Sequence, residues 1–329
     1  MPDEYLTQRF ADSLHPQARR LILSIISDLS NLVSESELTA LLETQDVTGL
    51  LTLWGERMGD QLFIHISSLT GLFVNTAASV GIPTAISLRT SFTANSPRLL
   101  HYLRSRAGVL ITAIAADTLL SIRSLLATAY TEGIGARALG RQVRLIVGLL
   151  PQHTAAVARY ADLLHRSNIP EARLNHMIST YAHRLHAWRA ENIARTELIA
   201  AATAGQLEAW QQMVDDGLLD PLRFWVEWVV TEDDRLCPLC APLDGQRVRL
   251  GSSFVSDRRG FPEGFEPVSS PGSRRRTVPL RPDPLSQPRD HLGRFAQITK
   301  AFEPLDHPQV IEHPPLHPQC RCALRLRFA

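Results

Sequence analysis

The sequence predicts an α+β protein in which a mostly helical N-terminal two-thirds precedes a small, metal-stabilised β domain with a long irregular insertion. Up to about residue 220, apolar residues recur every three to four positions, the spacing of an amphipathic helix. From Phe224 the spacing approaches two, which is typical of a strand. No cysteine occurs before Cys237, so every thiol lies in the predicted β domain.

We divide the chain into three parts. Residues 1–92 form an N-terminal helical region, residues 93–220 a helical core, and residues 221–329 the small β domain. Within the last part, residues 251–315 are rich in proline, glycine, serine and arginine and show little periodicity. We therefore expect an irregular excursion there and not a core.

Several helices have clear start or stop signals. Ser96 and Pro97 are typical of an N-cap and a first helical position, and an apolar face follows them. Gly217 is expected to end the longest helix, and Pro221 prevents its continuation. Further helices are predicted over residues 117–130, residues 136–147, a stretch that begins near Pro151, and residues 171–216.

Three strands are predicted in the β domain. The first covers residues 224–231, and residues 246–250 could return beside it after the turn at Asp244-Gly245. The end of the chain alternates between two kinds of side chain, which predicts a strand with one buried face and one basic face. The buried set is Cys320, Cys322, Leu324, Leu326 and Phe328, and the basic set is Arg321, Arg325 and Arg327.

The thiols form two tight clusters, Cys237-Pro-Leu-Cys240 and His317-Pro-Gln-Cys320-Arg-Cys322. A Cys-x-x-Cys turn offers two thiolates, and a second loop can complete a tetrahedral shell. We therefore predict one structural Zn²⁺ per chain, for which five side chains compete for four positions. Disulfides between the clusters, or free thiols, are the alternative. The candidate ligands are Cys237, Cys240, His317, Cys320 and Cys322.

The net charge of +1 does not indicate a nucleic-acid-binding protein. The acidic N-terminus lacks the apolar stretch of a signal peptide, so we expect folding in a reducing cytoplasm. Residues 61–88 carry no charged side chain and are long enough to span a bilayer. Because this stretch contains polar residues and the breaker Gly81-Ile82-Pro83, we interpret it as a buried helix and not as a membrane span.

Two arginine groups could contact DNA. Arg137, Arg141 and Arg144 share one face of a short helix, which a solvated surface also explains. Arg274, Arg275 and Arg276 lie in the excursion and could bind phosphates through counterion release. A solvated loop is the alternative for this second group.

We find no convergent acid, base and nucleophile in the sequence and expect no enzymatic activity. Asp233 and Asp234 precede the first cysteine cluster, where turn and cap residues are common. His291, His307 and His313 lie in the irregular excursion. A nuclease would need a histidine and an acid held on ordered elements.

The order of several motifs is similar to a known family. Ile193-Ala-Arg-Thr-Glu197 is followed by Asp234-Arg-Leu-Cys-Pro-Leu-Cys240, Leu243-Asp-Gly245 and Pro315-Leu-His-Pro-Gln-Cys-Arg-Cys322. Together these motifs resemble the phage Mu protein F-like minor head proteins, the phage head morphogenesis family, over about residues 95–329. The motif residues outside the ligand set are Arg195, Thr196, Glu197, Asp234, Asp244 and Gly245.

The resemblance implies a minor component of a tailed-phage virion, located at the portal vertex of the head and in the host cytoplasm during assembly. It implies the portal protein and the major capsid or scaffold protein as partners, with roles in head assembly and in DNA packaging or ejection. Double-stranded DNA, bound without sequence specificity, is a further partner to expect, and no small-molecule substrate is implied. A zinc-knuckle metal-dependent nuclease and a zinc-dependent DNA-binding regulator are the alternatives.

Overall fold

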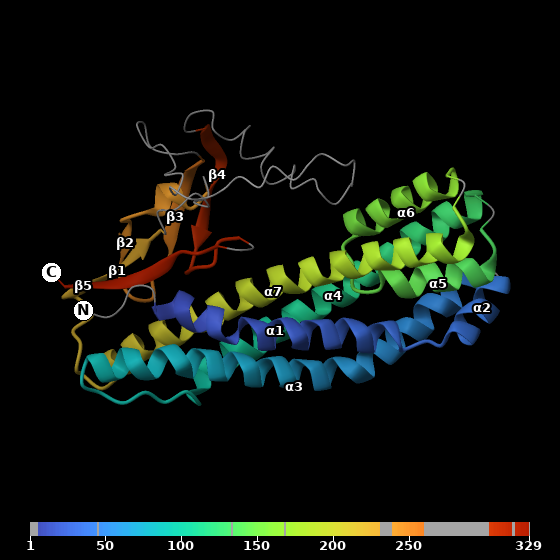
Figure 1. Ribbon diagram of the computed structural model, residues 1–329. Helices are drawn as coiled ribbons and strands as arrows, with labels where there is room; N and C mark the ends of the chain where they lie inside the picture. Colours follow the sequence, from blue (N-terminus) through green and yellow to red (C-terminus); the bar gives the residue numbers. More distant parts are fainter. Residues whose placement is uncertain are drawn as a thin grey trace. The chain divides into compact units, whose positions relative to one another are not determined.

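The computed structural model describes residues 6–44, 46–132, 134–167, 169–230, 239–259, 303–317 and 320–328. The predicted fold class is confirmed, because helices fill the first two-thirds and a small sheet follows (Figure 1). The helices are α1 (Leu6–Ser30), α2 (Glu35–Glu43), α3 (Val47–Ser87), α4 (Pro97–Glu132), α5 (Ala136–Ile146), α6 (Pro151–His165), α7 (Glu171–Asp215) and the 3₁₀ turn η1 (Ala241–Leu243). The strands are β1 (Phe224–Val229), β2 (Arg247–Val248), β3 (Phe254–Arg259), β4 (Glu303–Ile311) and β5 (Ala323–Phe328).

The contacts divide the chain into two compact units, each assembled from separate segments. The first unit contains residues 1–15, 73–100 and 195–329, and the second contains residues 16–72 and 101–194. Four helices, α1, α3, α4 and α7, continue from one unit into the other. The units therefore do not follow the continuous parts into which we divided the sequence.

Two predicted helix boundaries are wrong. The helix that begins at Pro97 does not end before Asp117 but runs to Glu132 as α4. Ala115 and Ala116 precede Asp117, and alanine is the best helix former, so nothing interrupts the helix there. Pro83 does not break α3, which ends at Ser87, and Thr84 Oγ1 donates to Val80 O at 2.8 Å in the turn that contains the proline.

A buried arginine fixes the turn between α5 and α6 in the second unit. Arg189 donates to Gly148 O at 2.8 Å and to Asp117 Oδ2 at 2.6 Å. Burial lowers the pKa of the neighbouring His186 to about 4, so its ring is neutral at pH 7. His186 Nε2 lies 2.8 Å from Val147 O and is therefore the donor. The two side chains satisfy the carbonyls that follow α5, which explains why this turn can be buried.

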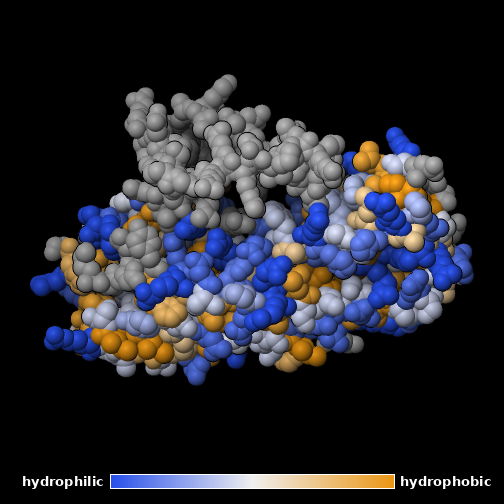
Figure 2. Space-filling model, in the orientation of Figure 1, coloured by the Kyte–Doolittle hydropathy of each residue, from blue (hydrophilic) through white to orange (hydrophobic). Residues whose placement is uncertain are grey.

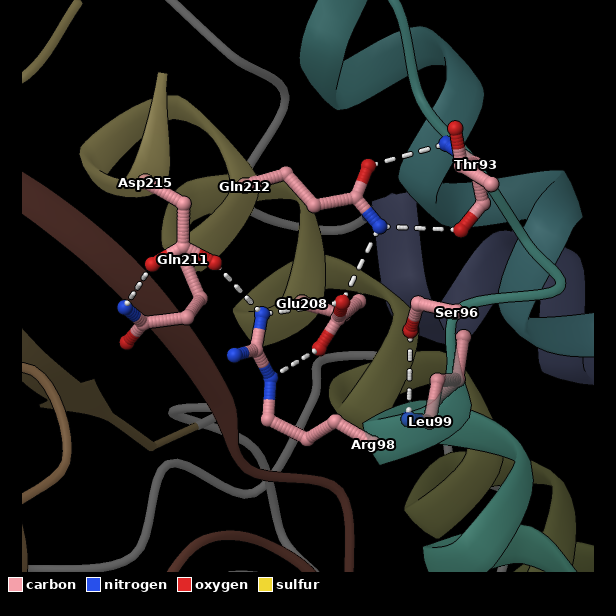
Figure 3. Close-up of polar contacts among 8 residues, drawn as sticks. All are labelled: Thr93, Ser96, Arg98, Leu99, Glu208, Gln211, Gln212 and Asp215. Atoms are coloured by element: carbon pink, nitrogen blue, oxygen red, sulfur yellow. Dashed lines mark hydrogen bonds and ion pairs between the residues drawn. The ribbon is translucent and has the colours of Figure 1, made fainter. Parts of the chain in front are cut away.

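In the first unit, a polar network fixes the first turn of α4 and the segment before it against the last turns of α7 (Figure 3). Arg98 donates to both carboxylate oxygens of Glu208, at 2.8 and 3.0 Å, and to Asp215 Oδ2 at 3.0 Å. The Gln212 amide pairs with the backbone N–H and carbonyl of Thr93 at 2.9 Å each. The bidentate pair matters because Glu208 is buried, and a buried carboxylate without a partner is costly.

Small residues allow α7 to approach α3 closely in the same unit. Ala200, Ala201 and Ala202 of α7 are all buried. A Cβ atom added at Gly205 would collide with the backbone carbonyl of Ala77 on α3. The absence of a side chain at Gly205 therefore sets the separation of the two helices.

The charge-free stretch of α3 is half buried, although its composition predicts full burial. Phe63–Ser87 and Pro97–Ala129 are long and apolar enough to cross a membrane, and 50% and 44% of their apolar windows are buried. Core helices of soluble proteins have the same composition, so this is weak evidence for a membrane. Phe63 is 79% exposed, and Figure 2 shows hydrophobic patches along the lower edge of the view, where Figure 1 places α3.

Strand β1 is the centre of a three-stranded antiparallel sheet with the order β2-β1-β5. The predicted strands at residues 224–231 and 246–250 and at the end of the chain are all present, with shorter bounds. Phe224, Val226 and Trp228 alternate along β1 and are buried against Trp210 of α7 and Leu324 of β5. This core attaches the sheet to the end of the longest helix.

The prediction that residues 251–315 contribute no core is wrong at both ends of that segment. Strands β3 and β4 pair antiparallel, with Phe254 opposite Ile311. Both residues join the core of the small sheet, and the Phe254 ring contacts Trp228 edge-on at a centroid distance of 5.2 Å. Composition missed this pairing because the two partners are separated by a long stretch in the sequence.

We predict that Gly205→Ala lowers the free energy of unfolding by about 1–3 kcal/mol, the usual cost of overpacking. The added methyl group must push α3 away, because it meets backbone and not a flexible side chain. Urea denaturation followed by circular dichroism measures the change. Gly71→Ala is the matched control, since a Cβ at Gly71 meets nothing within 4 Å and should stabilise α3 by up to about 1 kcal/mol. A Gly205→Ala protein as stable as the Gly71→Ala protein would contradict the close packing.

Candidate metal centre

The pairing of β1 with β5 brings the two ligand clusters together. Val229, at the end of β1, lies opposite Ala323, at the start of β5. The chain that leaves β1 leads to Cys240 at the beginning of η1, and the chain that enters β5 contains Cys320 and Cys322. Residues far apart in the sequence therefore meet at one end of the sheet because an antiparallel pair brings the exit of one strand beside the entry of the other.

The distances among these side chains suit a single ion. Cys240 Sγ lies 3.1 Å from His317 Nε2 and 3.8 Å from Cys320 Sγ. The three ligand atoms all lie within 4.8 Å of one another. A tetrahedral ion with bonds of about 2.3 Å to sulfur separates two sulfurs by about 3.8 Å. The sulfur pair already has this separation.

Cys322 is a fourth candidate ligand beside this group of three. Its thiol is buried and forms hydrogen bonds with the thiols of Cys240 and Cys320. The prediction that Cys320 and Cys322 share the face of a strand needs a correction, because β5 begins only at Ala323. A turn in which Cys320 N donates to His317 O at 3.1 Å precedes the strand and helps to gather the ligands.

Hydrogen bonds among the thiols shift the pKa values of Cys320 and Cys322 in opposite directions. Hydrogen bonds from Cys240 and Cys322 lower the pKa of Cys320 well below its usual value, against the effect of burial. For Cys322, the hydrogen bond to Cys240 lowers the pKa, but the hydrogen bond to Cys320 and burial outweigh it and raise the pKa well above its usual value. One thiolate stabilised by neighbouring thiols is the arrangement from which a cation would release the remaining protons.

The described cysteines are not joined by disulfides. No disulfide joins Cys240, Cys320 and Cys322 to one another, since the 3.8 Å between Cys240 Sγ and Cys320 Sγ is far longer than an S–S bond of about 2.05 Å. Leu243, Phe254 and Trp228 belong to the apolar cluster that contains these cysteines. A cluster of soft donors with an apolar surround can bind a metal ion, and its position between loops suits a structural ion.

Several of the other predicted site residues lie outside the described part of the chain, and three arginines lie on α5. Cys237, Asp234, His291 and the arginine run Arg274, Arg275 and Arg276 lie outside the described residues. Arg137, Arg141 and Arg144 lie on α5 in the second unit; the first two are exposed, and Arg144 donates to Asn31 Oδ1 at 2.7 Å.

The described motif residues have local structural roles. Arg195 pairs with Asp12 at 2.8 Å, and Thr196 and Glu197 follow it on α7. Asp244 Oδ1 accepts a hydrogen bond from Val230 N at 3.1 Å. Gly245 has a φ of 70°, and its N–H donates to Trp228 O at 2.9 Å. This turn therefore holds the C-terminal end of β1 in place.

Sequence reasoning missed one functional group, the buried carboxylate of Glu227. It lies on β1 among Arg247, Arg325 and Arg327, which come from the two neighbouring strands. The sequence contained a signal for this site. Glu227 stands at an outward position of its strand, and the strand at the end of the chain carries alternating arginines. Use of this signal required the register, which composition does not contain.

Comparison of the chain with protein-family models, with curated proteins and with solved structures finds no match. A functional assignment therefore depends on the chemistry of the cluster and on the motifs themselves.

We predict that Cys320→Ser, or treatment with a chelator, unfolds the small sheet and leaves the helices of the second unit folded. The cluster joins loops that the short strands alone hold weakly, and loss of a structural metal costs such domains their fold. Near-ultraviolet circular dichroism should lose the signal of the buried Trp228, while the helical far-ultraviolet signal mostly remains. An unchanged near-ultraviolet spectrum after chelation would show that the sheet does not need the metal.

Proposed function

We propose that the cluster of Cys240, His317, Cys320 and Cys322 binds one structural zinc ion. The observation that carries this proposal is the convergence of Cys240, His317 and Cys320 within 4.8 Å. Thiolate and imidazole are the donors that zinc prefers in tetrahedral structural sites. Four protein ligands leave no open coordination position, so the ion would stabilise the fold and not activate water.

We predict about one zinc ion per chain in protein purified from a reducing cytoplasm, because four ligands hold one ion. His317→Ala should lower both the zinc content and the midpoint of thermal unfolding, as measured by elemental analysis and calorimetry. His313→Ala is the matched control, since His313 lies on the same connection, its Nδ1 lies 2.6 Å from Pro314 O, and it does not belong to the group of converging ligand atoms. Zinc-free protein with two disulfides by mass spectrometry would refute the proposal.

We also propose, from the motif order, that the chain is a minor head protein of a tailed phage. The support is that Arg195-Thr196-Glu197, Asp244-Gly245 and the cysteine motif occur in the order and spacing of that family. The protein would lie at the portal vertex of the virion and would first be present in the host cytoplasm. Its partners would be the portal protein and the major capsid or scaffold protein, with DNA as a contact without sequence specificity.

The nuclease and regulator alternatives lack comparable support in the described part of the chain. There, the cluster at Cys240 is the only group of three or more side chains found close enough to hold a metal. A metal-dependent nuclease would need a second, open site with carboxylate or histidine ligands. DNA cleavage in Mg²⁺ that His313→Ala abolishes would favour the nuclease.

We predict that the protein copurifies with the portal of its own phage and is present in far fewer copies than the major capsid protein. Portal vertices are single, whereas capsid subunits tile the whole shell, so an attached protein must be rare. Quantitative mass spectrometry of procapsids and virions measures the ratio. Copy numbers that match the capsid protein, or absence from both particles, would refute the assignment.

A further inference from the structure

The outward face of the three-stranded sheet is a row of arginines around one carboxylate. Glu227 of β1 lies opposite Arg247 of β2 and Arg325 of β5 in the strand register. One step along the same face, Trp225 lies opposite Arg327. The core lies on the other face of the sheet, where Phe224, Val226 and Trp228 are buried.

Glu227 holds the three neighbouring guanidinium groups in place. Its carboxylate lies 3.6 Å from Arg247 and 3.2 Å from Arg325, and it also pairs with Arg327. The Glu227 side chain is only 6% exposed, whereas those of Arg247 and Arg327 are 53% and 37% exposed. The carboxylate is therefore covered by the arginines, and the solvent meets guanidinium groups.

Arg249 extends the positive surface beyond the carboxylate. Its guanidinium carbon lies 3.6 Å from the centre of the Trp225 ring, and its Nη1 donates to Phe224 O at 2.7 Å. Stacking and the hydrogen bond fix this side chain before any ligand arrives. Among the described residues of this face, four arginines accompany one carboxylate, which gives a surplus of three positive charges within one small sheet.

We propose that this sheet face, made of Arg247, Arg249, Arg325 and Arg327 around Glu227 and Trp225, binds the phosphate backbone of a nucleic acid without reading its sequence. The chain is almost neutral overall, so a local surplus of three charges is a feature of this face and not of composition. One guanidinium group can donate two parallel hydrogen bonds to the oxygens of one phosphate. Arginines that are already held in place lose little conformational entropy on binding.

The spacing of the arginines favours nucleic acid over an acidic protein. Residues two apart on a strand are separated by about 6.7 Å, and strands β2 and β5 lie about 9.6 Å apart across β1. The first distance is comparable to that between successive phosphates on a nucleic-acid strand, so Arg325 and Arg327 can contact neighbouring phosphates. Acidic peptides carry carboxylates on flexible side chains and have no such fixed repeat.

This inference rests on the DNA contact proposed above and names its surface, and it does not depend on the zinc or portal assignments. The test measures binding of the full-length, metal-loaded protein to a short fluorescent DNA duplex of mixed sequence by anisotropy over a range of salt. We expect a dependence of the association constant on salt that corresponds to about three or four phosphate contacts.

Arg247→Ala is the main variant, because Arg247 makes the longest of the three pairs with Glu227 and is more than half exposed. It should lower the affinity about tenfold at low salt and reduce the salt dependence by about one phosphate contact. Arg325→Lys/Arg327→Lys keeps the charge and should preserve the salt dependence. Near-ultraviolet circular dichroism checks that each variant keeps the folded sheet.

The matched control is Arg104→Ala/Arg123→Ala, which removes two exposed arginines from α4 and should leave affinity within about twofold. An equal loss in this control and in Arg247→Ala would show that net charge decides binding and would overturn the inference. Unchanged affinity in Arg247→Ala would also overturn it, yet leave the DNA contact in place at another surface. No binding by the wild-type protein would defeat both.

Two competitors distinguish nucleic acid from the other ligands that could bind this face. Poly-glutamate that displaces the duplex at equal charge concentration would indicate an acidic protein partner and overturn the inference. Inorganic phosphate that displaces it at millimolar concentration would indicate a site for free anions and overturn it as well. Displacement by unlabelled DNA of unrelated sequence, with neither of the other effects, is the expected result.

Discussion

The antiparallel pairing of β1 with β5 is the contact on which the C-terminal part of the protein depends. It joins residues about a hundred positions apart, such as Glu227 and Arg325. Closing a chain segment of that length costs about 4 kcal/mol of entropy in a simple polymer estimate. Six residue pairs, the apolar core on one face and the ion pairs on the other together offset that cost.

The same pairing places both candidate surfaces at once. At the end of the sheet where β1 exits, it brings Cys240 beside Cys320 and Cys322. On the outward face, it brings the arginines of β5 to the carboxylate of Glu227. A change that loosens the strand pair should therefore disturb the metal ligands and the basic face together, whereas a change on α5 should disturb neither.

The two faces of the sheet are stabilised by different interactions. On the inner face, tryptophan and phenylalanine side chains remove apolar area from water. On the outer face, a buried carboxylate is tolerated because arginines surround it, so that neighbouring strands are linked by charge. A metal ion at the end of the sheet would add a third restraint, which a sheet with one two-residue strand needs.

The sequence alone determined the fold class, the limits of α5 and α7 and the ligand candidates, because these depend on local spacing. Apolar periodicity and the signals at Pro97, Pro151 and Gly217 are read within a few residues, and clustered thiols are visible without a fold. Only the tertiary structure decided the partners of Phe254, Glu227 and Gly205. Each contacts a residue far away in the chain, and the register and helix separation that create such contacts arise from packing and not from local preference.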